Sequence, residues 1–272
     1  MLPAGWISIL IIAVTFIVSY SAFKNRNLFT KLQFEVDKIL VHKDFKRLIT
    51  AAFVHVNWMH LIFNLVALFF FSFGLEATLG ALAFTIIYFA SIVGGNLLAL
   101  LIHKKDAGYS VVGASGAING IIFASIAVNP YITILFLPGW LFALIYVGFS
   151  IYGIRSQQSN IGHEAHLGGA IIGMLVAILF YPTALTENWL PILLVLIPCL
   201  VFIIVILRKP HWILVQNTWH NQTYNYTVDD RYNAKEKNTQ QEVDRILEKI
   251  HRKGINSLSR KEKEILEEFS KK

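Results

Sequence analysis

The sequence contains one cysteine, Cys199, and few charged side chains for its length. A single cysteine excludes a disulfide within the chain and a zinc site built from several thiolates. Charged residues make up 15% of the 272 positions, whereas a soluble domain carries about 25%. The chain therefore lacks the charged surface that is typical of a soluble protein.

Hydrophobic residues take the place of the missing charge, at 55% of the chain. They form apolar runs, and a helix needs about 17–25 such residues to cross a hydrocarbon layer roughly 30 Å thick. We expect an all-α, polytopic membrane bundle with seven spans: Leu2–Phe23, Trp58–Phe73, Leu79–His103, Val111–Val128, Ile132–Gly153, His166–Tyr181 and Trp189–Leu207. The first run is expected to be retained, because no basic residue precedes it and no A-x-A cleavage site follows it.

The formal net charge is +7, and the excess of basic residues lies outside the spans. Such an excess suits a membrane surface and gives no reason to expect nucleic acid as a partner. In a seven-span arrangement the polar C-terminal segment and most basic residues of the loops lie on one side of the membrane. These loop residues are Lys24, Arg26, Lys31, Lys38, Lys43, Lys46, Arg47, Lys104, Lys105 and Arg155. The usual preference of Lys and Arg for cytoplasmic loops would make this side cytoplasmic.

The composition becomes polar after the last apolar run, which predicts three parts. We expect a membrane domain over residues 1–207, a polar linker over 208–240 and a helical hairpin over 241–272. The hairpin rests on helically spaced apolar residues, a stop at Gly254, and a capping box formed by Ser259 and Glu262. About 30 residues are too few for an independent core, so the hairpin should dock on a loop, a lipid surface or another copy; its partner is unknown.

Several polar side chains interrupt the apolar runs. Such residues are costly at membrane depth and usually face the protein interior at a functional site. Because alternate spans enter the membrane from the same side, three of them should lie at similar depth, within about 10 Å of one surface. These are His60, Ser115 and His166. Asn64 stands one helical turn after His60, on the same face.

These residue types can support nucleophilic catalysis. A serine hydroxyl becomes a good nucleophile when a neighbouring histidine takes its proton. His60 and Asn64 could donate hydrogen bonds to the oxyanion that then forms. Gly113 and Gly116 flank Ser115 and remove bulk where a substrate backbone would approach. Gly169 and Gly173 supply a facing surface of small residues.

Three motifs on alternate spans, His55–Asn64, Gly113–Gly116 and Ala165–Gly169, together resemble the rhomboid intramembrane serine proteases. The resemblance covers roughly residues 1–207 and implies a six-helix core with one added C-terminal span. It implies Ser115 as nucleophile, His166 as general base, and an oxyanion hole formed by the Ser115 N–H, His60 and Asn64. Arg47, His55, Glu76 and Gly80 also fall where that family places such residues.

The same resemblance implies no acidic third member and no metal or cofactor. Its implied substrates are transmembrane proteins cleaved within the lipid bilayer, and we expect a multi-pass protein of the bacterial inner membrane. It also implies that the site faces outward, which conflicts with the charge distribution. One departure concerns Asn119, which stands four residues after the serine, where an aromatic residue often stacks on the histidine. His166 is then expected to be held by a hydrogen bond instead.

The sequence is compatible with three other functions. Four histidines on one side could form a metal site, although His163 and His166 are one residue short of the H-E-x-x-H spacing. A catalytically inactive relative could bind membrane clients, and broken polar spans could serve a transporter. We expect His55 and His163 to be structural and Glu164 to be a solvated loop charge.

Overall fold

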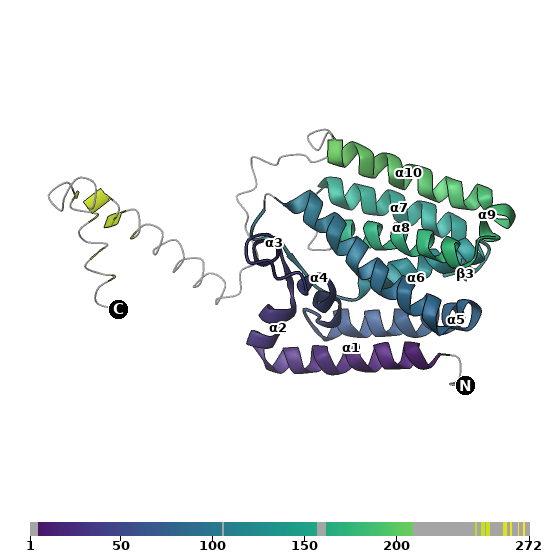
Figure 1. Cartoon of the computed structure of the whole chain (residues 1–272), viewed down its shortest axis with the longest axis horizontal. Coiled ribbons are helices and arrows are strands. Elements are labelled where there is room, and N and C mark those ends of the chain that lie inside the picture. The colour runs from purple at the N-terminus through teal and green to yellow at the C-terminus, as the bar shows by residue number, and fades with distance from the viewer. Residues whose placement is uncertain are drawn as a thin grey trace. The chain divides into compact units, whose positions relative to one another are not determined.

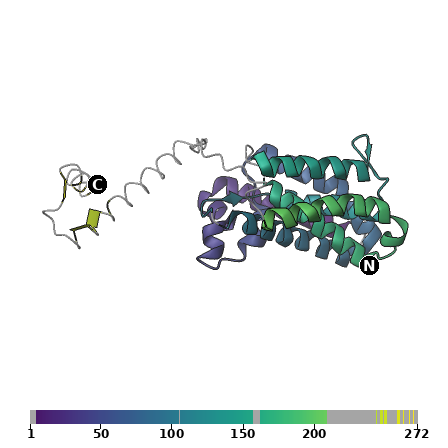
Figure 2. The same cartoon turned by 90° about the horizontal axis from the view of Figure 1, so that it is seen from above.

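The computed structural model describes residues 5–104, 106–156 and 162–208, and separate positions between 243 and 269. The chain divides into two compact units, residues 1–216 and 217–272. In the first unit, apolar helices pack side by side (Figures 1 and 2). They are α1 (Trp6–Lys24), α5 (Trp58–His103), α6 (Ser115–Val128), α7 (Gly139–Ser156), α8 (His163–Phe180) and α10 (Trp189–Arg208).

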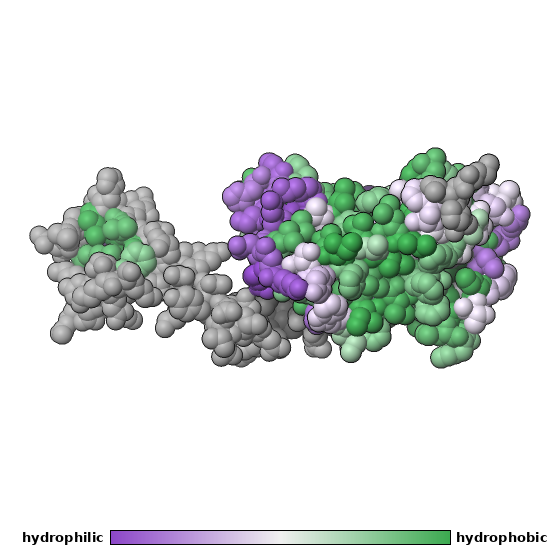
Figure 3. All heavy atoms as spheres, turned by 90° about the horizontal axis from the view of Figure 1, so that it is seen from below, coloured by the Kyte–Doolittle hydropathy of each residue, from purple (hydrophilic) through white to green (hydrophobic). Residues whose placement is uncertain are grey.

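Five of these helices are long and apolar enough to cross a membrane, and α6 is a shorter apolar helix. Figure 3 shows apolar side chains over the middle of the unit, with polar side chains gathered toward its ends. Helix α5 alone has 46 residues, which is about twice the length of one span. The predicted polytopic helical bundle is confirmed.

Helix α5 consists of two arms that meet at Gly80. This glycine has φ 84° and ψ 161°, a backbone conformation that other residues rarely adopt. The first arm is antiparallel to α1, because the Trp58 ring lies 5.0 Å from that of Phe23, whereas Glu76 lies at the opposite end of α1. There the Glu76 carboxylate accepts hydrogen bonds from the Ser8 hydroxyl at 2.6 Å and the Ser8 N–H at 2.8 Å. The predicted break after Phe73 was wrong, because the chain stays helical up to this glycine.

Helix α6 lies at the centre of the bundle. Every residue from 117 to 127 is buried, and the most extensive packing in the unit joins α6, α8 and α5. Fourteen residues give a helix only about 21 Å long, which is roughly 9 Å short of the hydrocarbon thickness. One end of α6 must therefore lie below a membrane surface.

Two predicted spans begin later than expected. Residues 133–138 form a hairpin of β3 (Thr133–Ile134) and β4 (Leu137–Pro138), so α7 begins at Gly139. Helix α6 begins at Ser115, because β2 (Ser110–Val111) pairs with β1 (Phe34–Glu35) ahead of it. Helix α8, in contrast, begins three residues earlier than expected.

The segment between α1 and α5 is folded into short elements that the sequence did not predict. They are α2 (Arg26–Leu32), β1, α3 (Val36–Leu40), α4 (Arg47–Thr50) and the 3-10 helix η1 (Ala51–Phe53); α9 (Ala184–Glu187) precedes α10. Buried Arg47 organises this segment, since its Nη1 donates to the carbonyls of Thr30 and Gln33, both at 2.7 Å. Burial of Asp44 opposes its ionisation, but a hydrogen bond from Arg47 and the charge of Lys46 hold its pKa below the usual value.

The second unit carries the capping box that the sequence predicted. The Ser259 N–H donates to the Glu262 carboxylate at 2.7 Å, and the Glu262 N–H donates to the Ser259 hydroxyl at 3.3 Å. Lys249 donates to the same carboxylate at 2.8 Å. The stop at Gly254 and most of the linker lie outside the described residues, so the boundaries of the hairpin stay a prediction.

Candidate active site

Ser115 is the first residue of α6, and the backbone that leads into it is fixed from two sides. The Gly113 N–H donates to the Ala51 carbonyl at 2.9 Å, and the Ala114 N–H donates to His55 Nε2 at 3.3 Å. Gly113 has φ 115°, and a side chain there would collide with the ring of His60. This glycine is required both for the turn into α6 and for the approach of His60.

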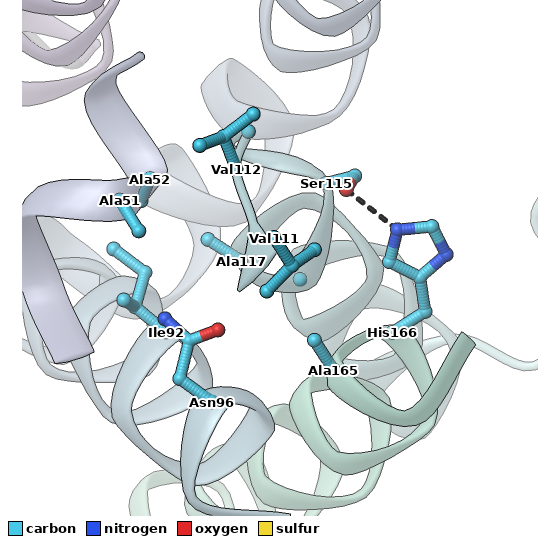
Figure 4. Close-up of a pocket in the computed structure, with 12 residues that line it drawn as sticks. Ala51, Ala52, Ile92, Asn96, Val111, Val112, Ser115, Ala117, Ala165 and His166 are labelled. Carbon is cyan, nitrogen blue, oxygen red and sulfur yellow. Dashed lines mark hydrogen bonds between the residues drawn. The ribbon is translucent and has the colours of Figure 1, made fainter. Parts of the chain in front are cut away.

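The side chains of Ser115 and His166 meet across α6 and α8. Ser115 Oγ lies 2.6 Å from His166 Nε2, which is a short hydrogen bond (Figure 4). His166 stands one turn into α8, and both side chains remain partly exposed. A hydroxyl at this distance from an imidazole can lose its proton to the ring during attack on a carbonyl.

A pocket opens beside this pair of side chains and is bounded mainly by small and aliphatic residues (Figure 4). Its lining is Ala51, Ala52, Ile92, Asn96, Val111, Val112, Gly113, Ser115, Gly116, Ala117, Ala165 and His166. Asn96 serves two purposes, because it lines the pocket while its Nδ2 donates to the Leu48 carbonyl at 2.7 Å. Its lining offers mainly apolar contacts next to the serine hydroxyl.

His55 is fully buried and joins α1 to the residue before Ser115. The Ser19 hydroxyl donates to the Phe53 carbonyl at 2.8 Å, so its oxygen must accept the bond from His55 Nδ1, also at 2.8 Å. Nε2 is then the acceptor for the Ala114 N–H, which requires the neutral ring. Burial, assisted by the neighbouring His60, lowers the pKa of His55 to about 3 and keeps the ring neutral. His55 is structural in this arrangement, as expected.

His60 and Asn64 lie on one face of α5, as their spacing predicts. The edge of the His60 ring faces Gly113, two residues before the serine. Buried Asn64 donates from Nδ2 to the His60 carbonyl at 2.8 Å. An amide nitrogen carries two hydrogens, so a second donor remains. The pocket lining includes neither residue, and the structure brings only His60 against the loop that leads to Ser115.

Glycines allow the helices around the site to approach closely. A side-chain carbon at Gly169 of α8 would collide with the backbone of Gly116, and one at Gly173 would collide with the backbone of Gly120. On α5, one at Gly95 would collide with the Ala165 carbonyl. The separation of Ser115 from His166 therefore depends on backbone contact between α6 and α8.

The second ring nitrogen of His166 has a partner that the sequence did not reveal. His166 Nδ1 lies 3.2 Å from the hydroxyl of Tyr146, on α7. Asn119 does not stack on the ring; its Nδ2 donates to the Ser115 carbonyl at 2.8 Å. The expectation that a hydrogen bond holds His166 agrees with this geometry. The only hint in the sequence was the absence of an aromatic residue at position 119.

The expectation that Glu164 is a solvated loop charge was wrong. This residue lies in the first turn of α8 and is 6% exposed. Its carboxylate lies 3.0 Å from His103 Nε2 and accepts a hydrogen bond from the Tyr109 hydroxyl at 3.4 Å. The His103 and Tyr109 rings stack with their centroids 3.6 Å apart. Glu164 thereby ties the end of α5 and the loop before α6 to the start of α8.

The histidines near the site are not arranged as a set of metal ligands. Both ring nitrogens of His55 and both of His166 are already hydrogen-bonded. Within the part of the chain that the structure describes, no group of three His, Cys, Asp or Glu side chains is placed to hold a metal ion.

Comparison with known proteins identifies the fold that carries this site. Residues 42–183, more than half of the chain, match the Rhomboid domain family. The chain belongs to the rhomboid family. The matched segment contains every site residue named above except Ser19, from Leu48 to Gly173. Residues 226–272 match a separate family of unknown function (DUF6576).

Rhomboid relatives come from bacteria and from organelles. The chain is 30% identical over 148 residues to rhomboid protease AarA of Providencia stuartii. The matched segment covers 47% of this chain and 53% of AarA. The chain is 32% identical over 139 residues to putative rhomboid protease YdcA of Bacillus subtilis, covering 49% and 66%. RHOMBOID-like protein 12, mitochondrial, of Arabidopsis thaliana is 30% identical over 148 residues, covering 47% and 44%. The chain thus spans about half the length of the curated relatives that it matches.

Proposed function

We propose that this rhomboid is an intramembrane serine endopeptidase that cleaves transmembrane or membrane-proximal segments of membrane proteins. The observation that carries the proposal is the 2.6 Å contact between Ser115 Oγ and His166 Nε2 at the wall of a pocket. The rhomboid proteases among the relatives support it. We also propose that this protein lies in the bacterial inner membrane. This location is a proposal because the relatives include mitochondrial as well as bacterial proteins.

In the proposed reaction Ser115 Oγ attacks the carbonyl carbon of the scissile peptide bond. As the Oγ–C bond forms, the hydroxyl proton moves to His166 Nε2 and negative charge develops on the carbonyl oxygen. When the C–N bond breaks, His166 returns this proton to the leaving amine, which leaves an acyl-enzyme on Ser115. A water molecule then attacks the ester in the same way, with His166 again acting as base, and releases the acid product.

The proposed oxyanion hole combines backbone and side-chain donors. Ser115 is at the start of α6, where backbone N–H groups have no partner within the helix. His60 contacts the loop before Ser115, and Asn64 retains one free amide hydrogen. Donors fixed in this way stabilise the tetrahedral intermediate without rearranging during the reaction.

The test is cleavage of a model transmembrane substrate by the purified full chain in liposomes. Wild type should cleave it, and Ser115→Ala and His166→Ala should each abolish cleavage without lowering the unfolding midpoint. Cleavage retained by either variant contradicts the serine mechanism. A folded wild type that binds the substrate without cleaving it would instead favour a client-binding rhomboid. Inactivation by a chelator, together with activity that survives Ser115→Ala, would favour a metalloenzyme.

A further inference from the structure

The two ring nitrogens of His166 carry out different tasks in the proposed reaction. Nε2 can take the Ser115 proton only while it carries no hydrogen. In a neutral imidazole the hydrogen must then be on Nδ1, which needs an acceptor. The group opposite Nδ1 is the Tyr146 hydroxyl, at 3.2 Å. The tautomer of His166 therefore depends on what this hydroxyl does.

A tyrosine hydroxyl can accept or donate, and the two arrangements have opposite consequences. If Tyr146 donates to Nδ1, the ring hydrogen is on Nε2 and faces Ser115, so the base is blocked. If the phenolic hydrogen points elsewhere, the oxygen accepts Nδ1–H and the base is free. What matters is whether another acceptor takes the phenolic hydrogen.

Two polar side chains, those of Asn119 and Ser150, neighbour the Tyr146 hydroxyl, but the structure shows no hydrogen bond from either to it. Asn119 is the neighbour to which we assign the phenolic hydrogen. Asn119 Nδ2 donates to the Ser115 carbonyl at 2.8 Å, and a carbonyl can only accept, so the orientation of the amide is fixed. Its other polar atom, Oδ1, is therefore the one left for an incoming hydrogen. Asn119 is 7% exposed, so water has little access to replace this interaction.

We propose that Tyr146 is a positioning residue for His166. The tyrosine oxygen accepts the Nδ1 hydrogen of His166, and the tyrosine hydroxyl donates its own hydrogen to Asn119. The inference deepens the proposed function and rests on it. When the Ser115 proton reaches Nε2, the Nδ1 hydrogen stays on His166 and no proton passes to Tyr146. The tyrosine oxygen then faces the positive imidazolium and stabilises it.

Packing holds the Tyr146 ring in place for this task. The ring stacks on Phe142 one turn earlier in α7, with centroids 6.0 Å apart, and meets the edge of Phe123 of α6 at 5.9 Å. Substitution by phenylalanine would keep these ring contacts and remove only the hydroxyl. Tyr152 provides a matched control, because it lies on the same helix and its side chain is exposed.

The experiment compares Tyr146→Phe and Tyr152→Phe in the full chain. Tyr146→Phe should lower kcat for a peptide substrate, and the limiting rate of inactivation by a fluorophosphonate, by roughly 10–100-fold, by analogy with the loss when the hydrogen-bond partner of a metal-bound histidine is removed. KM should change less than kcat, and Tyr152→Phe should match wild type. Wild-type rates in Tyr146→Phe, or a rise in KM alone, would overturn the inference.

A second variant tests the role of Asn119. Asn119→Ala should slow inactivation on its own, because Tyr146 can then donate to Nδ1, but it should add little to the loss in Tyr146→Phe. Additive losses in the double variant would overturn the link. If folded wild type does not react with the probe, the proposed function fails; if wild type reacts and Tyr146→Phe reacts equally, only this inference fails.

Discussion

Asn64 shows how a single residue can divide its hydrogen bonds between structure and the proposed chemistry. One amide hydrogen is bonded to the His60 carbonyl, and the other is available for an oxyanion. Asn64→Ala should therefore reduce kcat by roughly 10²–10³, with a smaller change in KM. Asn27→Ala, at an exposed position, is the control. If Asn64→Ala turns over substrate at the wild-type rate, Asn64 is only a packing residue of α5.

His55 predicts a pH dependence of stability. Burial lowers its pKa to about 3 from an ordinary value near 6.5, so between these values the unfolded chain binds a proton that the folded chain does not. The free energy of unfolding should therefore fall as the pH is lowered from 6.5 toward 3. His55→Gln keeps a donor and an acceptor but does not titrate, so its stability should vary less over this range in detergent. Parallel curves for the two proteins would contradict this assignment.

At this scale the sequence revealed some residues and hid others. His60, Ser115 and His166 were visible because ionisable or polar groups are conspicuous in apolar runs. Tyr146 was hidden, because a phenol is ordinary in a membrane helix and its importance depends on a helix distant in sequence. Glu164 was predicted to be a solvated loop charge because it follows a loop in the sequence. Only the fold brings His103 and Tyr109 against it.

The elements that matter most for the site are α6 and α8, which touch through glycines. Gly169→Ala would place a carbon against the Gly116 backbone and force the helices apart. We expect it to lower the free energy of unfolding by about 1–3 kcal/mol and to reduce activity, because Ser115 and His166 separate. Gly148→Ala on α7 is the control, since it meets no neighbouring atom. A Gly169→Ala protein with the stability and activity of Gly148→Ala would contradict this account.

Element positions were easier to predict than their ends. Apolar runs predicted where the long apolar helices lie, because a hydrocarbon layer requires their length. The ends depended on features with little local pattern, such as the positive φ of Gly80 and the pairing of Ser110–Val111 with Phe34–Glu35. The short elements between α1 and α5 were missed because their stability comes from contacts such as those of Arg47.

On the scale of the whole molecule, two separate segments of the chain match two different sequence families. The Rhomboid match ends at residue 183, and the second match begins at residue 226. The site is built wholly within the first unit, so we propose a regulatory or interaction role for the C-terminal segment. Truncation after Lys209 should leave labelling of Ser115 by a small serine probe unchanged, while cleavage of full-length substrates or association can change. A truncated protein that is folded but not labelled would show that the segment belongs to the active enzyme.

The most direct test of the central claim is the reaction of the purified full chain with a fluorophosphonate, with the modified residue located by mass spectrometry. The claim predicts one adduct, on Ser115, at a rate that falls to background in His166→Ala. No adduct should form in Ser115→Ala. A folded wild-type protein that does not react, or an adduct on any other residue, would contradict the assignment of Ser115 and His166 as the catalytic pair.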